Sequence, residues 1–229
     1  MTKSKRRPIV IQEARRAPTS KETVLLSRAS AIRALDLTVA LAALAFLFPL
    51  LVLVAILVFA FDPGPIFFAQ RRIGQHGVHF RCFKFRSMAT NAEERLQHVL
   101  QTDLAAREEW QRDHKLKRDP RITGIGGFLR KSSMDELPQL INVLKGEMSL
   151  VGPRPIVDAE VSRYGRYFAH YCLTKPGITG LWQISGRNNV SYRRRVAFDV
   201  AYSRSVSFKL NLKILAYTIP SVLLAKGSY

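Results

Sequence analysis

A long apolar segment limits the folds that this chain can adopt. Between Leu37 and Phe61 no residue carries a charge, and a stretch of this length can cross a hydrocarbon core about 30 Å thick. Pro49 lies near its middle. Proline removes one helical hydrogen bond and its ring collides with the preceding turn, so we expect a broken membrane helix instead of a straight rod.

Basic residues flank this segment on both sides. Lys21, Arg28 and Arg33 precede it. A second group follows it: Arg71, Arg72, Arg81, Lys84 and Arg86. Because Lys and Arg mark the cytoplasmic flanks of membrane segments, neither end is typical of an exterior flank. A single spanning helix is the alternative, but the pattern favours a re-entrant helix over residues 31–61 that enters and leaves the membrane on one side.

The N-terminal tail and the overall charge fit a membrane surface. Residues 1–30 are basic with little apolar periodicity, which predicts a disordered tail that touches anionic lipid. The chain has 36 Lys and Arg against 17 Asp and Glu, a formal net charge of +19. This balance fits nucleic acid, an anionic membrane or phosphorylated substrates as partners. Cys82 and Cys172 have no short spacing, which favours a reducing compartment.

The remaining residues, 62–229, predict one domain that is mainly helical with a small β-hairpin, an α+β fold. The hairpin is expected over Ile66 to Met88, where Gly74 and Gly77 bracket a tight turn. Thr90 and Glu93 are spaced as a capping box for an amphipathic helix that continues towards Trp110.

Two further regions complete the expected fold. Gly124, Gly126 and Gly127 predict a flexible approach to a helix that holds Pro138 in its first turn and ends at Gly146. The apolar segment from Leu210 to Ala225 is too short and mixed to span a membrane. An interfacial amphipathic helix fits it, and burial in the core fits equally well.

Asp135 and Glu136 form an acidic pair and are the main candidates for site residues in the sequence. They are expected at a helix N-terminus, where free N–H groups and the helix dipole favour negative charge. Two capping carboxylates would explain such a pair in an arbitrary sequence. Here basic residues crowd the same short region, which favours a phosphate site; they are Arg130, Lys131, Lys145 and Arg154. Asp36 is expected to be an interfacial carboxylate near Arg33, or one with no special role.

Five blocks of residues follow one another in the chain: Lys84-Phe85-Arg86-Ser87-Met88, Asp119-Pro120-Arg121-Ile122-Thr123, Asp135-Glu136-Leu137-Pro138-Gln139, Val151-Gly152-Pro153-Arg154-Pro155 and Lys175-Pro176-Gly177-Ile178-Thr179-Gly180. With these blocks, the chain from about Arg33 to Tyr229 resembles the monotopic phosphoglycosyl transferases, a bacterial sugar transferase family. Trp182-Gln183-Ile184-Ser185-Gly186-Arg187-Asn188 and the closing Gly227-Ser228-Tyr229 look most like the undecaprenyl-phosphate galactose phosphotransferases, including the succinoglycan type. Phe48-Pro49 stands where many members have Ser-Pro.

The resemblance implies a mechanism and a set of site residues. Asp135 would be the nucleophile on a UDP-hexose, forming an aspartyl-phosphohexose and releasing UMP before undecaprenyl phosphate accepts the sugar phosphate. Glu136 would help to hold Mg²⁺. The substrate-binding candidates are Lys84, Arg86, Arg130 and Arg154. Near arginines and a helix N-terminus, Asp135 is expected to stay ionised at neutral pH.

The implied setting is the bacterial inner membrane, with the catalytic domain on the cytoplasmic face. UDP-galactose is the favoured donor and UDP-glucose the next, and a homodimer is a further expectation. A conventional glycosyltransferase would instead release UDP. A nucleic-acid binder would need aromatic platforms or a groove-reading helix, which the sequence lacks. A membrane scaffold would not need this acid pair.

Overall fold

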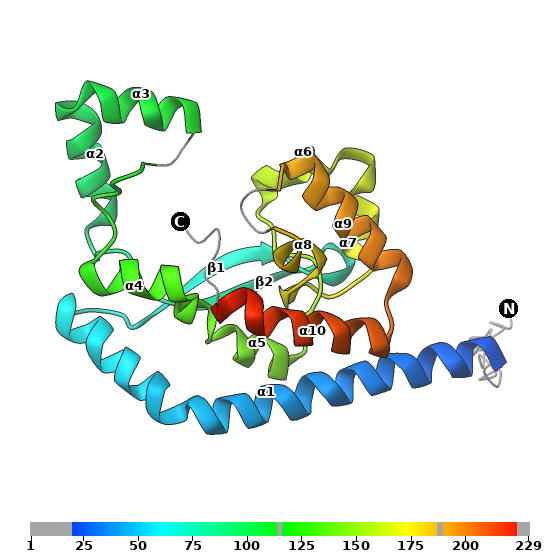
Figure 1. Ribbon diagram of the computed structural model, residues 1–229. Helices are drawn as coiled ribbons and strands as arrows, with labels where there is room; N and C mark the ends of the chain where they lie inside the picture. The colour runs from blue at the N-terminus through cyan, green and yellow to red at the C-terminus, as the bar shows by residue number, and fades with distance from the viewer. Residues whose placement is uncertain (1–19, 114–115, 187–189, 224–229) are drawn as a thin grey trace, which may run out of the picture.

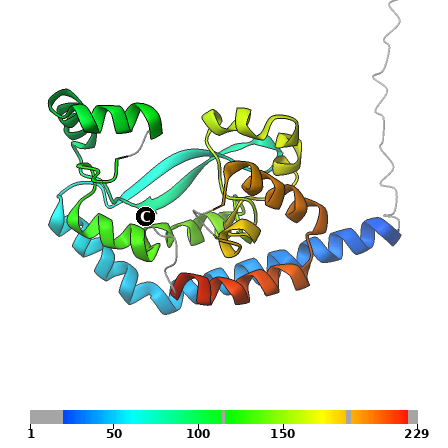
Figure 2. The ribbon, with the colours of Figure 1, turned by 45° about the horizontal axis from the view of Figure 1, so that its top comes forward.

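Helix α1 (Ser20–Phe61) lies along one side of the molecule, beneath the other elements in Figures 1 and 2. The computed structural model describes residues 20–113, 116–186 and 190–223. Pro49 lies inside α1, and the helix continues across it. The expected break is therefore absent from the secondary structure; α1 is a bent but unbroken helix in Figure 1, because one missing hydrogen bond bends a helix without ending it.

The start of α1 also shortens the expected basic tail. Residues 20–30, assigned to that tail from the sequence, form the first turns of α1. Leu, Ala and Arg are strong helix formers, so this stretch extends the apolar helix instead of remaining irregular. The rest of the expected tail lies outside the described residues.

The expected hairpin is confirmed. Strand β1 (Phe67–Ile73) pairs antiparallel with β2 (His79–Phe85), with Phe67 opposite Phe85 and Ile73 opposite His79. A short 3-10 turn, η1 (Gln75–Gly77), joins the two strands. Gly77 has a φ of +76°, a left-handed conformation that glycine adopts without steric cost.

The sequence predicted one helix that continues towards Trp110. The structure has two helices there, which project from the rest of the molecule (Figure 1). Helix α2 (Ala92–Thr102) and α3 (Leu104–Asp113) meet at Asp103, whose carboxylate accepts a hydrogen bond of 3.0 Å from the Ala106 N–H. The expected capping box is wrong: Asn91 is the N-cap, and the backbone N–H of Thr90 donates to Asp62 over 2.9 Å.

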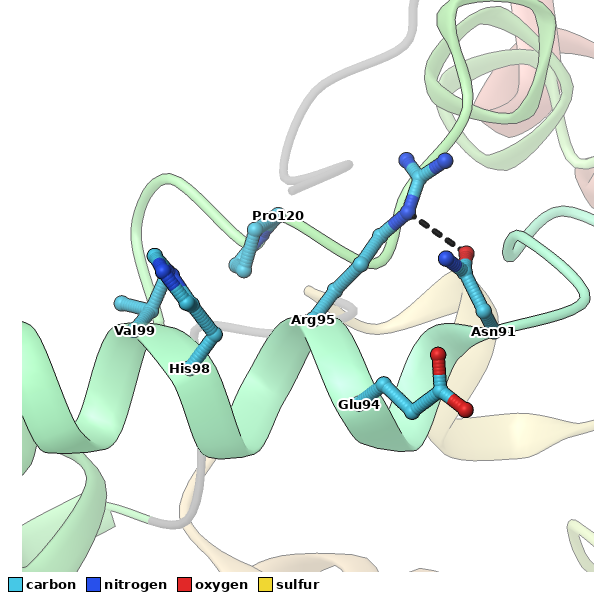
Figure 3. Close-up of a pocket in the computed structure, with 6 residues that line it drawn as sticks. All are labelled: Asn91, Glu94, Arg95, His98, Val99 and Pro120. Carbon is cyan, nitrogen blue, oxygen red and sulfur yellow. Dashed lines mark hydrogen bonds between the residues drawn. The ribbon is translucent and has the colours of Figure 1, made fainter.

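An open groove lies between α2 and Pro120. Figure 3 shows its lining residues, which are Asn91, Glu94, Arg95, His98, Val99 and Pro120. Arg95 donates a hydrogen bond of 2.7 Å to the side chain of Asn91. None of these six residues is among the candidate site residues.

Helix α4 (Gly124–Ser132) occupies the segment expected to be a flexible, glycine-rich approach. Thr123 caps it by accepting a hydrogen bond of 3.0 Å from the Gly126 N–H. A Cβ at Gly126 would collide with the Ser87 carbonyl group, so this glycine permits close packing of the helix. Ser133, with a φ of 59°, ends α4 in a left-handed turn.

The next helical turns carry the acid pair. A 3-10 turn, η2 (Met134–Glu136), leads through Pro138 into α5 (Gln139–Lys145). Gly146, with a φ of +82°, ends α5 as expected. After it, β3 (Ser149–Val151) pairs in parallel with β4 (Gly177–Thr179), a sheet that the sequence did not predict.

Short helices fill the C-terminal half. Between β3 and β4 lie the 3-10 turns η3 (Asp158–Glu160) and η4 (Gly165–Tyr167) with α6 (Val161–Tyr164) and α7 (Phe168–Cys172). After β4 come α8 (Leu181–Ile184), α9 (Tyr192–Ser205) and α10 (Phe208–Leu223). On α10, Asn211 and Ile214 are buried while Leu212 and Ile219 are exposed, so the helix joins the core and also presents an apolar outer face.

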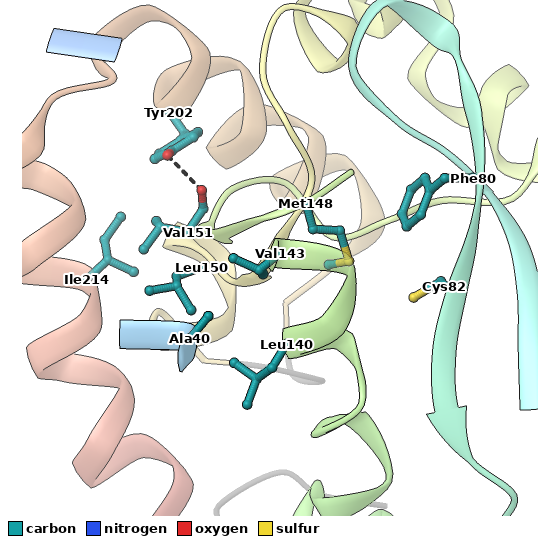
Figure 4. Close-up of a cluster of buried hydrophobic side chains, with 10 residues drawn as sticks. All are labelled: Ala40, Phe80, Cys82, Leu140, Val143, Met148, Leu150, Val151, Tyr202 and Ile214. Atoms are coloured by element: carbon teal, nitrogen blue, oxygen red, sulfur yellow. Dashed lines mark hydrogen bonds between the residues drawn. The ribbon is translucent and has the colours of Figure 1, made fainter. Parts of the chain in front are cut away.

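The main core lies where α1, β2, α5, β3 and α10 meet. Figure 4 shows its ten buried side chains, among them Ala40 of α1, Cys82 of β2, Val143 of α5 and Ile214 of α10. The C-terminal half of α1 has a cluster of its own, in which Val54 and Val58 are buried with Phe85 and Leu129. Both halves of α1 therefore pack against the same domain.

Polar contacts fix α1 near each end of its apolar segment. Arg33 donates hydrogen bonds to the Val143 and Leu144 carbonyls, at 2.7 and 3.0 Å. Just after α1 ends, the Asp62 carboxylate lies 3.3 Å from the Arg86 guanidinium, which also donates to the Asp62 carbonyl. The apolar segment of α1 is therefore attached to the same domain near both of its ends.

Much of α1 nevertheless faces outward. Ala29–Phe61 is the one helix in the described residues that is long and apolar enough to cross a membrane, and only 11% of its most apolar window is buried. Large exposed side chains include Leu41, Phe46, Phe48, Ile56 and Phe59. An exposed apolar surface of this extent is typical of a lipid-facing helix.

Candidate active site

Asp135 and Glu136 project from η2, between α4 and α5. The sequence placed them at a helix N-terminus; they lie in the 3-10 turn that leads into α5. Asp135 is buried, with 7% of its surface exposed. Burial of a carboxylate is costly unless charges or hydrogen bonds compensate for it, so the contacts of this pair decide its chemistry.

Lys84 is the cation closest to the acid pair. Its Nζ lies 2.6 Å from Glu136 Oε1 and 3.7 Å from Asp135 Oδ2. The hairpin brings it there from β2, although it precedes Glu136 by 52 positions in the chain. Both carboxylates thus share one ammonium group, and the structure brings together three of the residues that the sequence singled out.

Arg154 approaches the same carboxylate from the loop after β3. Its guanidinium lies 4.0 Å from Glu136 Oε1, and 47% of its side chain is exposed. Arg72, which sequence reasoning did not propose for the site, donates a hydrogen bond of 2.9 Å to the Pro155 carbonyl. Arg72 thereby holds the residue next to Arg154. Its presence in a basic hairpin strand was the only sequence signal.

The other two predicted basic residues are bound to partners outside the acid pair. Arg130 donates a hydrogen bond of 2.8 Å to the Ser87 hydroxyl, and its charge partly opposes the rise that burial causes in the pKa of Asp135. Arg86 is buried against Asp62 at the end of α1. Its contacts with Asp62 link the end of α1 to the residue that follows β2.

The two carboxyl groups have opposite pKa shifts. Burial raises the pKa of Asp135 above its ordinary value, and the nearby charge of Lys84 opposes that effect only in part. Burial also acts to raise the pKa of Glu136, but Lys84 and Arg154 outweigh it and the net pKa is lowered. The raised pKa of Asp135 is opposite to the effect expected from a helix N-terminus and arginines.

The acid pair offers oxygen ligands that suit Mg²⁺, although they do not form a complete cage. No group of three or more His, Cys, Asp or Glu side chains in the described residues gathers into a metal site. Mg²⁺ is commonly held by one or two carboxylates together with substrate phosphates and water. Asp135 and Glu136 fit that kind of site, in which phosphate oxygens complete the coordination.

Burial, paired carboxylates and converging cations define a site that can stabilise phosphate groups next to an acidic side chain. Comparison with known proteins agrees with this chemistry. The model of the bacterial sugar transferase family matches residues 27–225. The chain therefore belongs to the bacterial sugar transferase family, as the sequence motifs indicated.

Three curated relatives are similar over most of the chain. The exopolysaccharide production protein ExoY of Sinorhizobium fredii is 50% identical over 86% of this chain and 87% of its own length. The UDP-galactose-lipid carrier transferase of Erwinia amylovora is 51% identical over 86% of this chain. The undecaprenyl-phosphate galactose phosphotransferase of Salmonella typhimurium is 52% identical over 73%. The matches cover only 41% and 35% of the latter two relatives.

Proposed function

We propose that this protein transfers a hexose-1-phosphate from a UDP-sugar to undecaprenyl phosphate and releases UMP. The observation that carries the proposal is the acid pair, in which Asp135 is buried and Glu136 is partly buried, with the Lys84 ammonium 2.6 Å from Glu136. The names of the relatives support galactose as the sugar, with glucose as the alternative. The name of the ExoY relative supports a role in exopolysaccharide production. We place the transfer at the first step of exopolysaccharide or lipopolysaccharide repeat-unit assembly.

In the first step, an oxygen of Asp135 attacks the β-phosphorus of the UDP-sugar. The bond from that phosphorus to the oxygen shared with the α-phosphate breaks, and UMP leaves with the electron pair. The sugar phosphate is then held as an acyl phosphate on Asp135. In the second step, a phosphate oxygen of undecaprenyl phosphate attacks the same phosphorus, which frees Asp135 and yields undecaprenyl-diphosphate-hexose.

The cations around the pair suit this chemistry. Lys84 and Arg154 are close enough to Glu136 to offset charge that develops on the phosphates during transfer. Bound Mg²⁺, with Glu136 as one ligand, would neutralise diphosphate charge. Arg130 stays a candidate for binding the donor. Arg86 stays a candidate on sequence grounds, although its contacts with Asp62 favour a role in holding α1.

We also propose that α1 is embedded in the inner membrane as a re-entrant helix, with the catalytic domain on the cytoplasmic face. Contacts at Arg33 and Asp62 hold both ends of its apolar segment on one domain. A spanning helix would have to release one of them. This arrangement would keep the acid pair near the headgroups, where a soluble nucleotide sugar meets a lipid acceptor.

The test is to incubate the purified protein with Mg²⁺, undecaprenyl phosphate and either UDP-galactose or UDP-glucose, and to identify the nucleotide released. UMP together with sugar phosphate on the lipid is the expected result, and the more active donor identifies the hexose. Release of UDP would indicate conventional glycosyl transfer and overturn the mechanism. Omission of the lipid should leave at most one equivalent of UMP per enzyme, from the covalent intermediate.

A further inference from the structure

Asn142 makes three hydrogen bonds in the interior, between α5 and the hairpin. It has no exposed surface. Its Oδ1 accepts from the Phe83 N–H over 2.9 Å, while its Nδ2 donates to the Arg81 carbonyl and to Glu147 Oε2, each over 2.7 Å. The orientation of the amide is fixed by its partners, because an N–H can only donate and a carbonyl or carboxylate can only accept.

The amide of Asn142 bonds to β2 as a residue of a neighbouring parallel strand would. In a parallel pair, one residue bonds to two residues of the facing strand that are two positions apart. It donates to the carbonyl of the first and accepts from the N–H of the second. Arg81 and Phe83 stand in that relation and flank Cys82. β1 occupies the opposite edge of β2, so Asn142 joins helix α5 to the edge that faces it.

These hydrogen bonds fix the position of α5 along β2, which apolar packing alone does not fix. Leu140 and Val143 of α5 belong to the same buried cluster as Phe80 and Cys82 of β2 (Figure 4). Such contacts are non-directional, so they hold the helix against the strand without fixing how far one slides along the other. Hydrogen bonds with a narrow range of lengths and angles supply that restraint.

The restraint acts next to the candidate active site. Lys84 directly follows Phe83 in β2, and Glu136 lies in the turn that leads into α5. A shift of α5 along β2 would change the 2.6 Å contact between Lys84 and Glu136. We propose that Asn142 is a positioning residue that sets the placement of Lys84 against Asp135 and Glu136, an inference that rests on the proposed function.

A double-mutant cycle with Lys84 tests this role, with UMP release from radiolabelled donor as the readout. Asn142→Asp keeps the acceptor for Phe83 but replaces the amide that donates to Arg81 and Glu147. We expect it to slow UMP release about 10- to 100-fold, as a small misplacement of reacting groups does. In a Lys84→Met background the same change should slow release less than about twofold, since the group being positioned is gone.

Asn211→Asp is the matched control. Asn211 is likewise buried, with 1% exposed, and its Oδ1 accepts a hydrogen bond of 3.0 Å from the Tyr202 hydroxyl on α9. Its effect on UMP release should be the same in both backgrounds, as for a residue that acts only on stability. Rates are compared per folded protein, measured by thermal unfolding of each variant.

The outcomes separate this inference from the proposed function. Equal effects of Asn142→Asp with and without Lys84 would overturn the positioning role, whereas wild-type protein that releases no UMP would overturn the function itself. If Asn142→Asp does not fold, Glu147→Leu replaces it, because it removes one partner of the amide from a partly exposed site. Glu147→Leu should slow UMP release by a smaller factor than Asn142→Asp, and this effect should likewise depend on the presence of Lys84. If steady-state release by Lys84→Met is too slow to measure, single-turnover release with excess enzyme provides its rate.

Discussion

The carboxylate of Asp36, in α1, accepts a hydrogen bond of 2.9 Å from the backbone N–H of Leu150, 114 positions later. The Ser149 hydroxyl donates to the same oxygen over 3.0 Å. Asp36 is buried, with 3% of its surface exposed, so it is not the interfacial carboxylate expected from the sequence. Asp36 thus attaches α1 to β3, the strand that precedes the loop containing Arg154.

Replacement of Asp36 should therefore loosen α1 from the domain. Asp36→Ala leaves the Leu150 N–H and the Ser149 hydroxyl without this acceptor, which costs about 1–3 kcal/mol for a buried donor. Thermal unfolding of the purified protein in detergent measures the loss. Asp36→Asn is the control, because its amide oxygen still accepts, and it should unfold nearer to wild type. Equal unfolding temperatures for wild type and Asp36→Ala would contradict this account.

Asp135→Asn should remove turnover without loss of the fold. The amide has the same shape but is not a nucleophile that can form the acyl phosphate, so we expect UMP release to fall by at least about 10³-fold. Labelled sugar phosphate should remain on wild-type protein when lipid is omitted and be absent from Asp135→Asn. Near-normal turnover in this variant would exclude Asp135 as the nucleophile. Unfolding temperature serves as the control for structure.

Asp199 predicts how stability changes with pH. Burial raises its pKa from 3.8 to about 7, while a hydrogen bond of 2.6 Å from the Tyr164 hydroxyl and the charge of Arg195 oppose that rise. The folded state then binds the proton more tightly, so stability should fall as pH rises from about 4 to about 7 and stay low above that. The difference in pKa corresponds to about 4 kcal/mol at most.

Asp199→Asn tests this directly. Its amide oxygen still accepts from Tyr164 but has no proton to lose, so the variant should be more stable than wild type at pH 8 and differ less at pH 5. Unfolding temperatures of both proteins across this range provide the comparison. Parallel curves for the two proteins would show that Asp199 does not titrate in this window.

The proposed membrane arrangement makes a prediction about access. Ala29 and Arg118 are exposed on opposite sides of the apolar segment in sequence. Single cysteines at these positions, in a Cys172→Ser background, should react with a membrane-impermeant maleimide from the cytoplasmic face only. The background protein, whose Cys82 is 2% exposed, controls for native thiols. Reaction of the two cysteines from opposite faces would establish a spanning helix instead.

Local signals in the sequence predicted local structure well. Gly74 and Gly77 located the hairpin turn, and Gly146 located the end of α5, because each signal acts within a few residues. The predicted capping box is absent for a non-local reason, because the Thr90 N–H donates to Asp62, which lies 28 positions earlier in the chain. Three glycines suggested a flexible approach to a helix, but Gly126 lies within α4. Glycine is needed there because the Ser87 carbonyl leaves no room for a Cβ.

The candidate site was predictable as a list of residues and not as an arrangement. Family motifs named Lys84, Asp135 and Glu136, yet the contact between Lys84 and Glu136 depends on how α5 packs on β2. The same limit explains Asn142, whose residue type gives no hint of its three partners. Arg86 shows the converse, since its motif suggested substrate while its buried contacts are with Asp62.

The way Asn142 completes the edge of β2 also bears on solubility. A strand with an open edge offers unpaired N–H and carbonyl groups to any extended chain nearby, which is a common route to aggregation. Here the side-chain amide occupies that edge at Arg81 and Phe83, and on β1 the Ile73 N–H bonds to the Ile156 carbonyl over 3.0 Å. Part of each outer edge of the hairpin is thus covered, which restricts where it can join the sheet of another molecule.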